Sequence, residues 1–296
     1  MQIATSLFYD SAAKRMSSLT SRANALQTQI ATGKRIQSPS EDAALAQQTA
    51  EFDRKDADTA MYQTNLKLAG SLLDQADGVL TNINTQLQRA KELTTQAANG
   101  TQTAESRMLI GVELTAIVDS LVSLANTRNL RGQPLFGTED GTMAVTKTGD
   151  TSFSFAPTKV SDIPIGDGMS MSATESAGKI FADDGNGNSN LRMLAELAKS
   201  LSDGNAPGAT SLDDITKMSD TVSFVQASVG ARGARVELQQ NILQKASDDR
   251  AALRSSVEDV DITSAVTEMQ KIMTTLSATQ ASFTKLASLS LFDYLR

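Results

Sequence analysis

The feature that most constrains the fold of this chain is a pair of apolar seams, one near each end. In residues 12–30 and again in residues 262–287, apolar side chains recur at alternating steps of four and three. This spacing predicts helices that supercoil against a partner. The seam residues are Ala12, Met16, Leu19, Ala23, Leu26 and Ile30, and then Ile262, Val266, Met269, Met273, Leu276, Phe283 and Ala287. We expect the two ends to pair with each other, with copies of the chain, or with both.

Only Gln280 interrupts the second seam, and it has two interpretations. A buried polar residue would fix the register among subunits, whereas a solvent-facing one would mark a drift of the seam. A free subunit has little against which to bury the seams around Met16 and Met273. We therefore expect the terminal segments to be mobile in the monomer and to become ordered on assembly. Residues 1–10 are mixed, which predicts a frayed or strand-like start.

A helix-start signal follows the first seam. Gly33 is suited to ending the first helix. Ser38 can cap the next one, Pro39 suits its first position, and Glu41 completes a capping box. Asp42 adds negative charge to the first turn. The sequence therefore predicts that a second helix begins at Ser38.

The stretch from this signal to Ala98 contains neither Pro nor a turn cluster. A helix of about 55 residues would be about 80 Å long. Its apolar stripe from Leu73 to Ala97 is interpreted as an ordinary intramolecular core. Asn99-Gly100-Thr101 then predicts a turn, and residues 103–125 a third helix that forms an antiparallel hairpin with the second.

Residues 138–211 have a different texture, rich in Thr, Ser, Gly and Asp. Alternating residues predict a β-hairpin over 143–147 and 151–155. A further short pair is expected over 163–168 and 169–172. We therefore predict a small β-rich insert that projects from the helices.

A segment near the end of the insert, residues 183–190, superficially resembles a calcium loop. The sixth position holds Ser189 instead of Gly and the twelfth Ala195 instead of Glu, so the motif fails and no metal site is expected. A turn is the simpler interpretation, with Asn188 or Ser189 capping a helix over 191–201.

Helix resumes near Leu212 with no clear stop before Ser290. The fold class is therefore mainly α, with a long antiparallel helical rod or coiled coil formed by both chain ends and a small β-rich outer insert. The expected domains are a terminal coiled-coil assembly domain (1–40 and 256–296), a helical rod domain (41–137 and 212–255) and an outer domain (138–211).

Composition excludes several classes of function. The chain has no His and no Cys, which removes imidazole bases, thiol nucleophiles and the usual metal ligands. We therefore expect no enzyme and no cofactor. The net charge is −7 and basic residues are scattered among acids, so a nucleic-acid partner is not expected. The N-terminus has no signal-peptide pattern, and no apolar run of about 18 residues is apparent.

Several motifs beside the two seams resemble those of the bacterial flagellin superfamily. The form "TGKRI, then PSED" is most similar to the hook-associated protein 3 family, found at the junction between hook and filament. The motifs are Ala31–Ile36, Ser38–Ala43, Leu124–Thr127 with Gly132 and Leu135–Gly137, Gly230–Arg232 with Arg235–Glu237, Ser256–Ile262 and Leu289–Tyr294.

This resemblance implies a folded-back subunit whose two ends line the inside of a tubular or ring-shaped homo-oligomer. It implies a structural adapter that joins the hook-side junction protein to the flagellin filament and templates filament growth. It also implies an extracellular place in the flagellum, reached by the flagellar type III export route without a cleaved signal and with an export chaperone as partner.

Charged residues near the expected bends form a further hypothesis. We expect them to make salt bridges between neighbouring subunits, although local capping on a solvated surface is the simpler alternative. The residues are Lys34, Arg35, Glu41, Asp42, Arg232, Arg235, Glu258, Asp259 and Asp261.

Three alternatives to the junction protein stay open at this point. A filament-forming flagellin subunit would show the same terminal seams. A helical signalling scaffold would need a membrane span or a receptor domain. An enzyme would need convergent titratable groups in a pocket.

Overall fold

The computed structural model describes residues 2–129, 132–137, 142–156 and 162–294. Within these ranges the fold is mainly helical with four short strands, as predicted. The elements are α1 (Gln2–Thr32), α2 (Ala43–Ala98), α3 (Ala104–Ala125), β1 (Val145–Lys147), β2 (Phe153–Phe155), β3 (Asp162–Gly166), β4 (Met169–Ser172), α4 (Ala177–Ile180), α5 (Asn190–Ser202), α6 (Ser211–Glu258) and α7 (Ile262–Tyr294).

The chain divides into two compact units. The terminal unit comprises residues 1–57 and 246–296, and the central unit comprises residues 58–245. Both boundaries lie inside long helices, α2 and α6. The first turns of α2 and the last turns of α6 therefore belong with α1 and α7.

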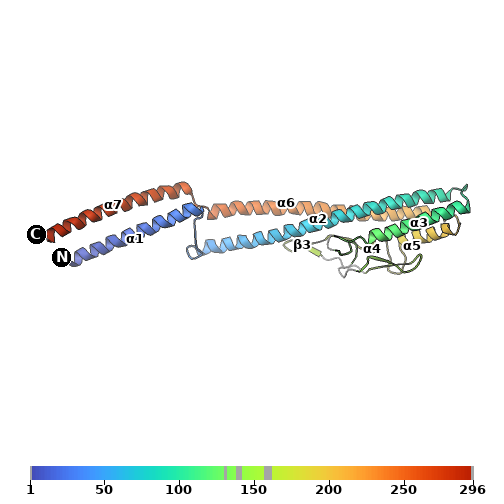
Figure 1. Ribbon diagram of the computed structural model, residues 1–296, viewed down its shortest axis with the longest axis horizontal. Helices are drawn as coiled ribbons and strands as arrows, with labels where there is room; N and C mark the ends of the chain where they lie inside the picture. The colour runs from blue at the N-terminus through green and yellow to red at the C-terminus, as the bar shows by residue number, and fades with distance from the viewer. Residues whose placement is uncertain (1, 130–131, 138–141, 157–161, 295–296) are drawn as a thin grey trace. The chain divides into compact units, whose positions relative to one another are not determined.

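In the terminal unit, α1 and α7 lie side by side (Figure 1). Their contact is a small cluster in which Ala23 and Leu26 of α1 meet Ala265 and Ile272 of α7. The helix α1 begins at Gln2, so the strand-like alternative for the start of the chain is wrong over residues 2–10. The segment lacks Pro and Gly, and nothing in its local chemistry interrupts a helix.

The helix α2 begins at Ala43, four residues later than a cap at Ser38 would place it. Asp42 is the actual cap, because its carboxylate accepts the Leu45 N–H at 3.0 Å. The Ser38 carbonyl instead accepts the Glu41 N–H at 3.1 Å, which makes residues 38–41 a turn. The Glu41 side chain reaches back to the Gln37 N–H at 3.2 Å. The capping residues were recognised, but they close a turn that precedes the helix.

A break between α6 and α7 was not expected from the sequence. The helix α6 ends at Glu258, and α7 begins at Ile262 behind Asp261. The Asp261 carboxylate accepts the N–H groups of Thr263 and Ser264 at 2.9 and 3.2 Å, and it also accepts the Ser264 hydroxyl at 2.7 Å. These bonds lower the pKa of Asp261, chiefly through Ser264. An Asp cap with a Ser three residues later was the available signal.

The central unit is built on the antiparallel pair of α2 and α6. The Ser219 hydroxyl donates to Asn84, and two turns further along α6 the Gln226 amide donates to Asp77 at 3.0 Å. The residue numbers rise along α6 as they fall along α2. Helix α3 follows a short connection and returns beside α2 (Figure 1). Thr103 caps α3 through the Ser106 N–H, as the predicted helix start requires.

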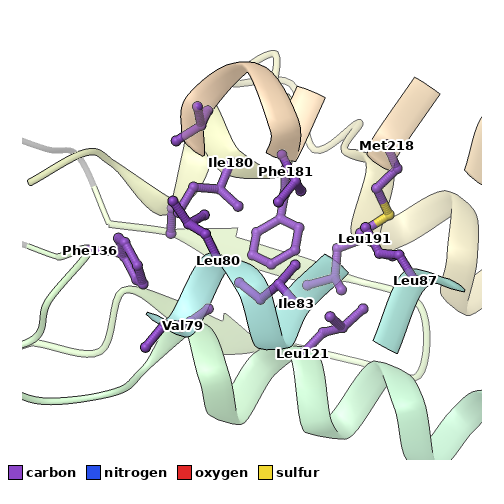
Figure 2. Packing of buried hydrophobic residues seen from close by; sticks show 14 of the residues in the cluster. Val79, Leu80, Ile83, Leu87, Leu121, Phe136, Ile180, Phe181, Leu191 and Met218 are labelled. Atoms are coloured by element: carbon purple, nitrogen blue, oxygen red, sulfur yellow. The ribbon is translucent and has the colours of Figure 1, made fainter. Parts of the chain in front are cut away.

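One continuous apolar core fills the central unit (Figure 2). It joins Leu80, Ile83 and Leu87 of α2 to Leu121 of α3, so the stripe interpreted as an intramolecular core is confirmed in that role. Further side chains come from the insert, α4, α5 and α6. The labelled ones are Phe136, Ile180, Phe181, Leu191 and Met218.

Helices α3 and α5 pack very closely at Gly111. A Cβ placed on Gly111 would lie 2.4 Å from the Ser202 nitrogen, so only glycine fits there. Contrary to expectation, α3 is long and apolar enough to span a membrane by length and composition. Core helices of soluble proteins pass the same test, and here Ile110, Leu114 and Leu121 are buried in the core.

The insert holds two separate antiparallel pairs, β1 with β2 and β3 with β4. Val145 faces Phe155 across the first pair, and Asp162 faces Ser172 across the second. The 183–190 segment is a turn. There Asp184 accepts from the Asn188 amide at 2.9 Å, which lowers the pKa of that carboxyl. The described residues form no cluster of three or more carboxylates placed to hold a metal ion.

Candidate assembly interface

The predicted seam of α1 is the face that meets α7. Ala23 and Leu26 are buried, while Leu19 and Ile30 are half-buried against the same cluster. Met16 is also half-buried. Four of the six residues of the α1 seam therefore contact the cluster with α7 within one chain.

The predicted seam of α7 is divided between two uses. Met269 packs against the α1 cluster, and Leu276 is half-buried, but the buried positions are Ala265 and Ile272. Ile262 and Met273 remain 54% and 53% exposed. Of the remaining positions, Val266 and Phe283 are half-buried and Gln280 is exposed.

Two overlapping apolar stripes on α7 explain this division. Ala265 and Ile272 are seven residues apart and face α1, and Ile262 and Met273 flank them on the neighbouring side. The seam predicted from the sequence is one apolar stripe, whereas α7 carries two. The signal was present, because Ala265 and Ile272 follow the same heptad step as the seam beside them. We call Ile262, Val266, Met273 and Gln280 the outer stripe of α7.

Further contacts hold the two terminal helices in register. The rings of Tyr9 and Phe283 meet edge to face, with centroids 5.4 Å apart. Arg22 pairs with Glu268, with Nη2 and Oε1 2.5 Å apart, but both side chains are well exposed. An exposed pair contributes about 0 to 1 kcal/mol, so the apolar contacts dominate this helix pair.

At the bend, the segment after α1 pairs with the segment after α6. The Arg35 N–H donates to the Glu258 carbonyl at 2.7 Å, and the Val260 N–H donates to the Gly33 carbonyl at 2.9 Å. Gly33 has φ of +71°, a left-handed conformation that favours glycine at a helix end. The bend is therefore held by backbone hydrogen bonds as well as by charge.

Glu258 is the buried charge of the bend, with a side chain only 9% exposed. Its carboxylate lies 3.4 Å from Lys34 Nζ and 3.7 Å from Arg254 Nε. Oxygen Oε1 of Glu258 is buried and accepts no hydrogen bond in the described structure. Within one chain, the partners of Glu258 at this bend are therefore Lys34 and Arg254.

Arginines of α6 extend this cluster, and the sequence analysis missed them. Arg254 pairs with Asp53 at 2.5 Å, and Arg250 pairs with Asp56 at 2.6 Å. The Asp53 carboxylate raises the pKa of Arg254 above its usual value, so the guanidinium stays charged. The spacing was visible, because Arg250 and Arg254 are four residues apart and share one helix face.

The other acids at the bend serve local structure. Glu41 and Asp42 close the turn and cap α2. Asp259 accepts from the Ser255 hydroxyl, and Asp261 caps α7. The simpler alternative, local capping, describes these four residues within the single chain. The hypothesis that they contact a neighbouring subunit stays a prediction.

The placement of Arg232 and Arg235 at a bend is wrong. Both lie well inside α6, which is continuous to Glu258. Arg232 is largely buried, and it pairs with Glu175 at 3.0 Å and donates to the carbonyls of Ser172 and Thr174. It therefore fastens the insert to α6. Arg235 is exposed on α6.

A cavity of about 340 Å³ opens beside the bend in the terminal unit. Its walls are apolar, from Ile36, Pro39 and Ala50, with Lys34 and Glu258 at one side. The charged groups of the lining are Lys34 and two carboxylates, those of Asp53 and Glu258. The largely apolar lining suits the contact of a protein surface.

The family comparisons agree with this architecture. The model of the bacterial flagellin N-terminal helical region matches residues 3–140, and that of the C-terminal helical region matches residues 212–295. Together they cover three quarters of the chain. The unmatched segment is most of the insert.

Curated relatives include junction proteins and flagellins. The flagellar hook-associated protein 3 of Salmonella typhimurium is 28% identical over 136 residues, which is 46% of this chain and 43% of the relative. This chain thus aligns with less than half of the length of the Salmonella protein and of its Escherichia coli counterpart. The flagellin of Listeria innocua is 26% identical over 83% of this chain and 81% of its own length.

Solved structures show a similar fold. A putative flagellar hook-associated protein from Vibrio parahaemolyticus has a TM-score of 0.66 at 20% identity, covering 74% of this chain and all of that one. The flagellar hook associated protein-3 of Legionella pneumophila has a TM-score of 0.64 at 13% identity, covering 71% of this chain and 98% of that one. The chain therefore belongs to the bacterial flagellin superfamily, and its sequence and fold are similar to those of hook-associated protein 3.

Proposed function

We propose that this chain is the structural adapter between the hook-side junction protein and the flagellin filament. It would form a ring or short tube of identical subunits and present a surface on which flagellin polymerises. The observation that carries the proposal is the outer stripe of α7, which leaves Ile262 and Met273 exposed beside a seam that is already filled. An apolar stripe on a helix that already has one partner provides a contact for another subunit.

Assembly supplies the driving force in this mechanism, and no bond is made or broken. The pair of α1 and α7 acts as the inner assembly domain, and the outer stripe becomes buried between copies. Gln280 lies on that stripe and would fix the register between subunits. The helices of residues 41–137 and 212–255 would form the surrounding rod, and residues 138–211 the outer domain.

The same proposal places the protein outside the cell as part of the flagellum. Export would proceed by the flagellar type III route with a chaperone and without a cleaved signal. The Salmonella and Listeria relatives are flagellar proteins by name, which supports this location. Terminal helices with a small core suit a chain that must unfold for passage.

Electron microscopy of a deletion strain tests the adapter. The expected result is that hooks are present, filaments are lost and flagellin accumulates in the medium. Complementation with the intact chain should restore filaments. Intact filaments on the deletion strain would refute the adapter function.

A second experiment tests the outer stripe. Met273→Asp should lower incorporation into flagella about tenfold, because a charge would enter an apolar contact. Thr274→Asp is the matched control, since Thr274 is an exposed neighbour on another side of α7. Equal incorporation of the two variants, with helix content unchanged, would argue against burial of the stripe.

A filament-forming flagellin is the alternative, supported by the alignment over 81% of the Listeria flagellin. The two functions differ in the products of self-assembly. A flagellin subunit should polymerise into long filaments from purified protein, whereas the adapter should form only limited oligomers and cap hooks. Seeded polymerisation followed by electron microscopy distinguishes them.

A further inference from the structure

Helix α6 carries a second apolar face that packs on nothing in the described part of the central unit. Val222, Val229 and Val236 are buried in the core. Phe224 and Leu238 are instead 77% and 60% exposed. The exposed side consists of Phe224, Ala231, Arg235, Leu238 and Ile242, which we call the α6 stripe. Successive residues of the stripe are seven, four, three and four positions apart, and this spacing keeps them on one helix face.

Helix α3 carries a second exposed apolar patch. Leu109 is 73% exposed, and Val112 and Met108 beside it are also exposed. These residues lie away from the side of α3 that is buried in the core. We call Glu105, Met108, Leu109 and Val112 the α3 patch.

The charges within the two surfaces are opposite. Arg235 lies within the α6 stripe and Glu105 at the start of the α3 patch, and both are exposed. Among the residues that the structure describes, neither lies within ion-pair distance of an oppositely charged group. Six other arginines in the described part of the chain do have such partners, as Arg89 does with Glu113. These two charges are therefore available to a partner.

The spacing of the two surfaces also matches. Glu105, Leu109 and Val112 follow steps of four and three, and Arg235, Leu238 and Ile242 follow steps of three and four. In each set the first and last residues are seven positions apart, a rise of about 10 Å along the helix. A parallel alignment therefore brings charge to charge and each apolar residue to an apolar residue.

The directions of the helices make such an alignment compatible with repeated assembly. Both α3 and α6 run antiparallel to α2, so they run in the same direction within the central unit (Figure 1). Parallel docking of α3 from one copy on α6 of the next would leave all copies pointing the same way. A contact between two different surfaces propagates into a ring or a helical array.

We propose that the α3 patch of one subunit docks on the α6 stripe of a second copy of this chain. This lateral contact adds to the contact proposed for the terminal helices. The lateral contact rests on the proposed function, because both require that copies of the chain assemble. It is made by the central unit, whereas the contact in the proposed function is made by the outer stripe of α7.

Disulfide cross-linking tests the contact, since the natural chain contains no Cys. Two full-length chains with different tags, Leu109→Cys and Leu238→Cys, are produced together in cells that lack the natural gene. Isolated flagella are then treated with a mild oxidant. We expect a cross-linked dimer that contains both tags and requires both variants. The pair of Leu109→Cys with Glu237→Cys is the matched control, because Glu237 is exposed on another face of α6.

Three outcomes decide between the contacts. A dimer at the level of the Glu237 control, in flagella that contain the protein, would overturn the proposal. Dimers formed by either variant alone would also overturn it, because they indicate a contact between identical surfaces. If the protein is absent from flagella, the adapter function fails, and the same pair in concentrated purified protein decides the lateral contact separately.

Charge exchange gives an independent readout. Arg235→Glu or Glu105→Arg alone should lower the cross-link yield about twofold or more, since like charges would then face each other. The two changes together should restore the yield. Retention of the full yield in both single variants would show that the two charges do not meet.

Discussion

The terminal and central units are both built from long antiparallel helices, yet they bury very different amounts of apolar surface. The cluster between α1 and α7 has four buried apolar residues, whereas the central core has forty among the described residues. The central unit has a third layer, because α5 and the insert cover α2, α3 and α6. A pair of helices without such a layer leaves most of its apolar surface available, which suits a unit that completes its core by assembly.

The two units also differ in what holds them. Packing dominates in the central unit, whereas in the terminal unit caps, backbone hydrogen bonds and charges around Glu258 and Asp261 supplement the small apolar cluster between α1 and α7. Such interactions are individually small and do not create a cooperative core. We therefore expect α1 and α7 to open more readily than the central helices.

The largest expected effect separates the two cores directly. Leu80→Ala should lower the free energy of unfolding by about 2–5 kcal/mol, because Leu80 is fully buried in the central core. Ile272→Ala should leave the main unfolding transition almost unchanged and speed hydrogen exchange in α1 and α7. Urea titration measures the free energy of unfolding, and hydrogen-exchange mass spectrometry measures the opening of α1 and α7. Equal shifts of the main transition would show that the two units unfold together, and strong protection of residues 12–30 and 262–287 in the monomer would contradict their mobility.

The next effect tests how tightly the third layer of the central unit is packed. Gly111→Ala should lower the unfolding free energy by about 1–3 kcal/mol, since its Cβ would collide with the backbone of Ser202. Gly78→Ala is the control, because open space surrounds Gly78 within α2 and Ala should stabilise the helix by about 0.5–1 kcal/mol. Thermal unfolding of the two variants shows whether each change lowers or raises the stability. A neutral Gly111→Ala would mean that α5 can move away from α3.

A smaller effect concerns the start of α2 in the terminal unit. Asp42→Ala should weaken the first turns of α2 by about 1 kcal/mol, because it removes the cap. Ser38→Ala should have less effect on the helix, since Ser38 belongs to the preceding turn. The two variants are compared by the rate of hydrogen exchange in the first turns of α2. A larger effect of Ser38→Ala would restore Ser38 as the cap.

The smallest effect is the pH dependence of the α7 start. The pKa of Asp261 is lowered in the folded state, so its stabilising contribution is present above the usual carboxyl pKa of about 3.9 and is lost as the pH falls through the folded value. Hydrogen exchange of the amides in the first turn of α7 should therefore become faster at acid pH than the intrinsic pH dependence of amide exchange predicts. Asp261→Asn should abolish this excess, and an unchanged excess in that variant would assign it to another group.

Much of the fold could be predicted because helix periodicity is local. The second and third helices, the two strand pairs and the Ser189 cap all follow from neighbouring residues. The errors came where two local signals compete. Ser38 and Asp42 are both good caps, and only the path of the chain at the bend selects Asp42. The break before Asp261 lies within a continuous helix-forming pattern, so it was missed.

The sequence by itself determined that both chain ends form amphipathic helices, that a long helical hairpin lies between them and that a polar insert interrupts the helices. These properties depend on spacing and composition along the chain. Only the tertiary structure decided which stripe of α7 faces α1, that Arg232 holds the insert, and that α3 and α6 each retain an exposed apolar face. Periodicity identifies the apolar faces of a helix, but which face becomes buried depends on the neighbours that the fold brings to it.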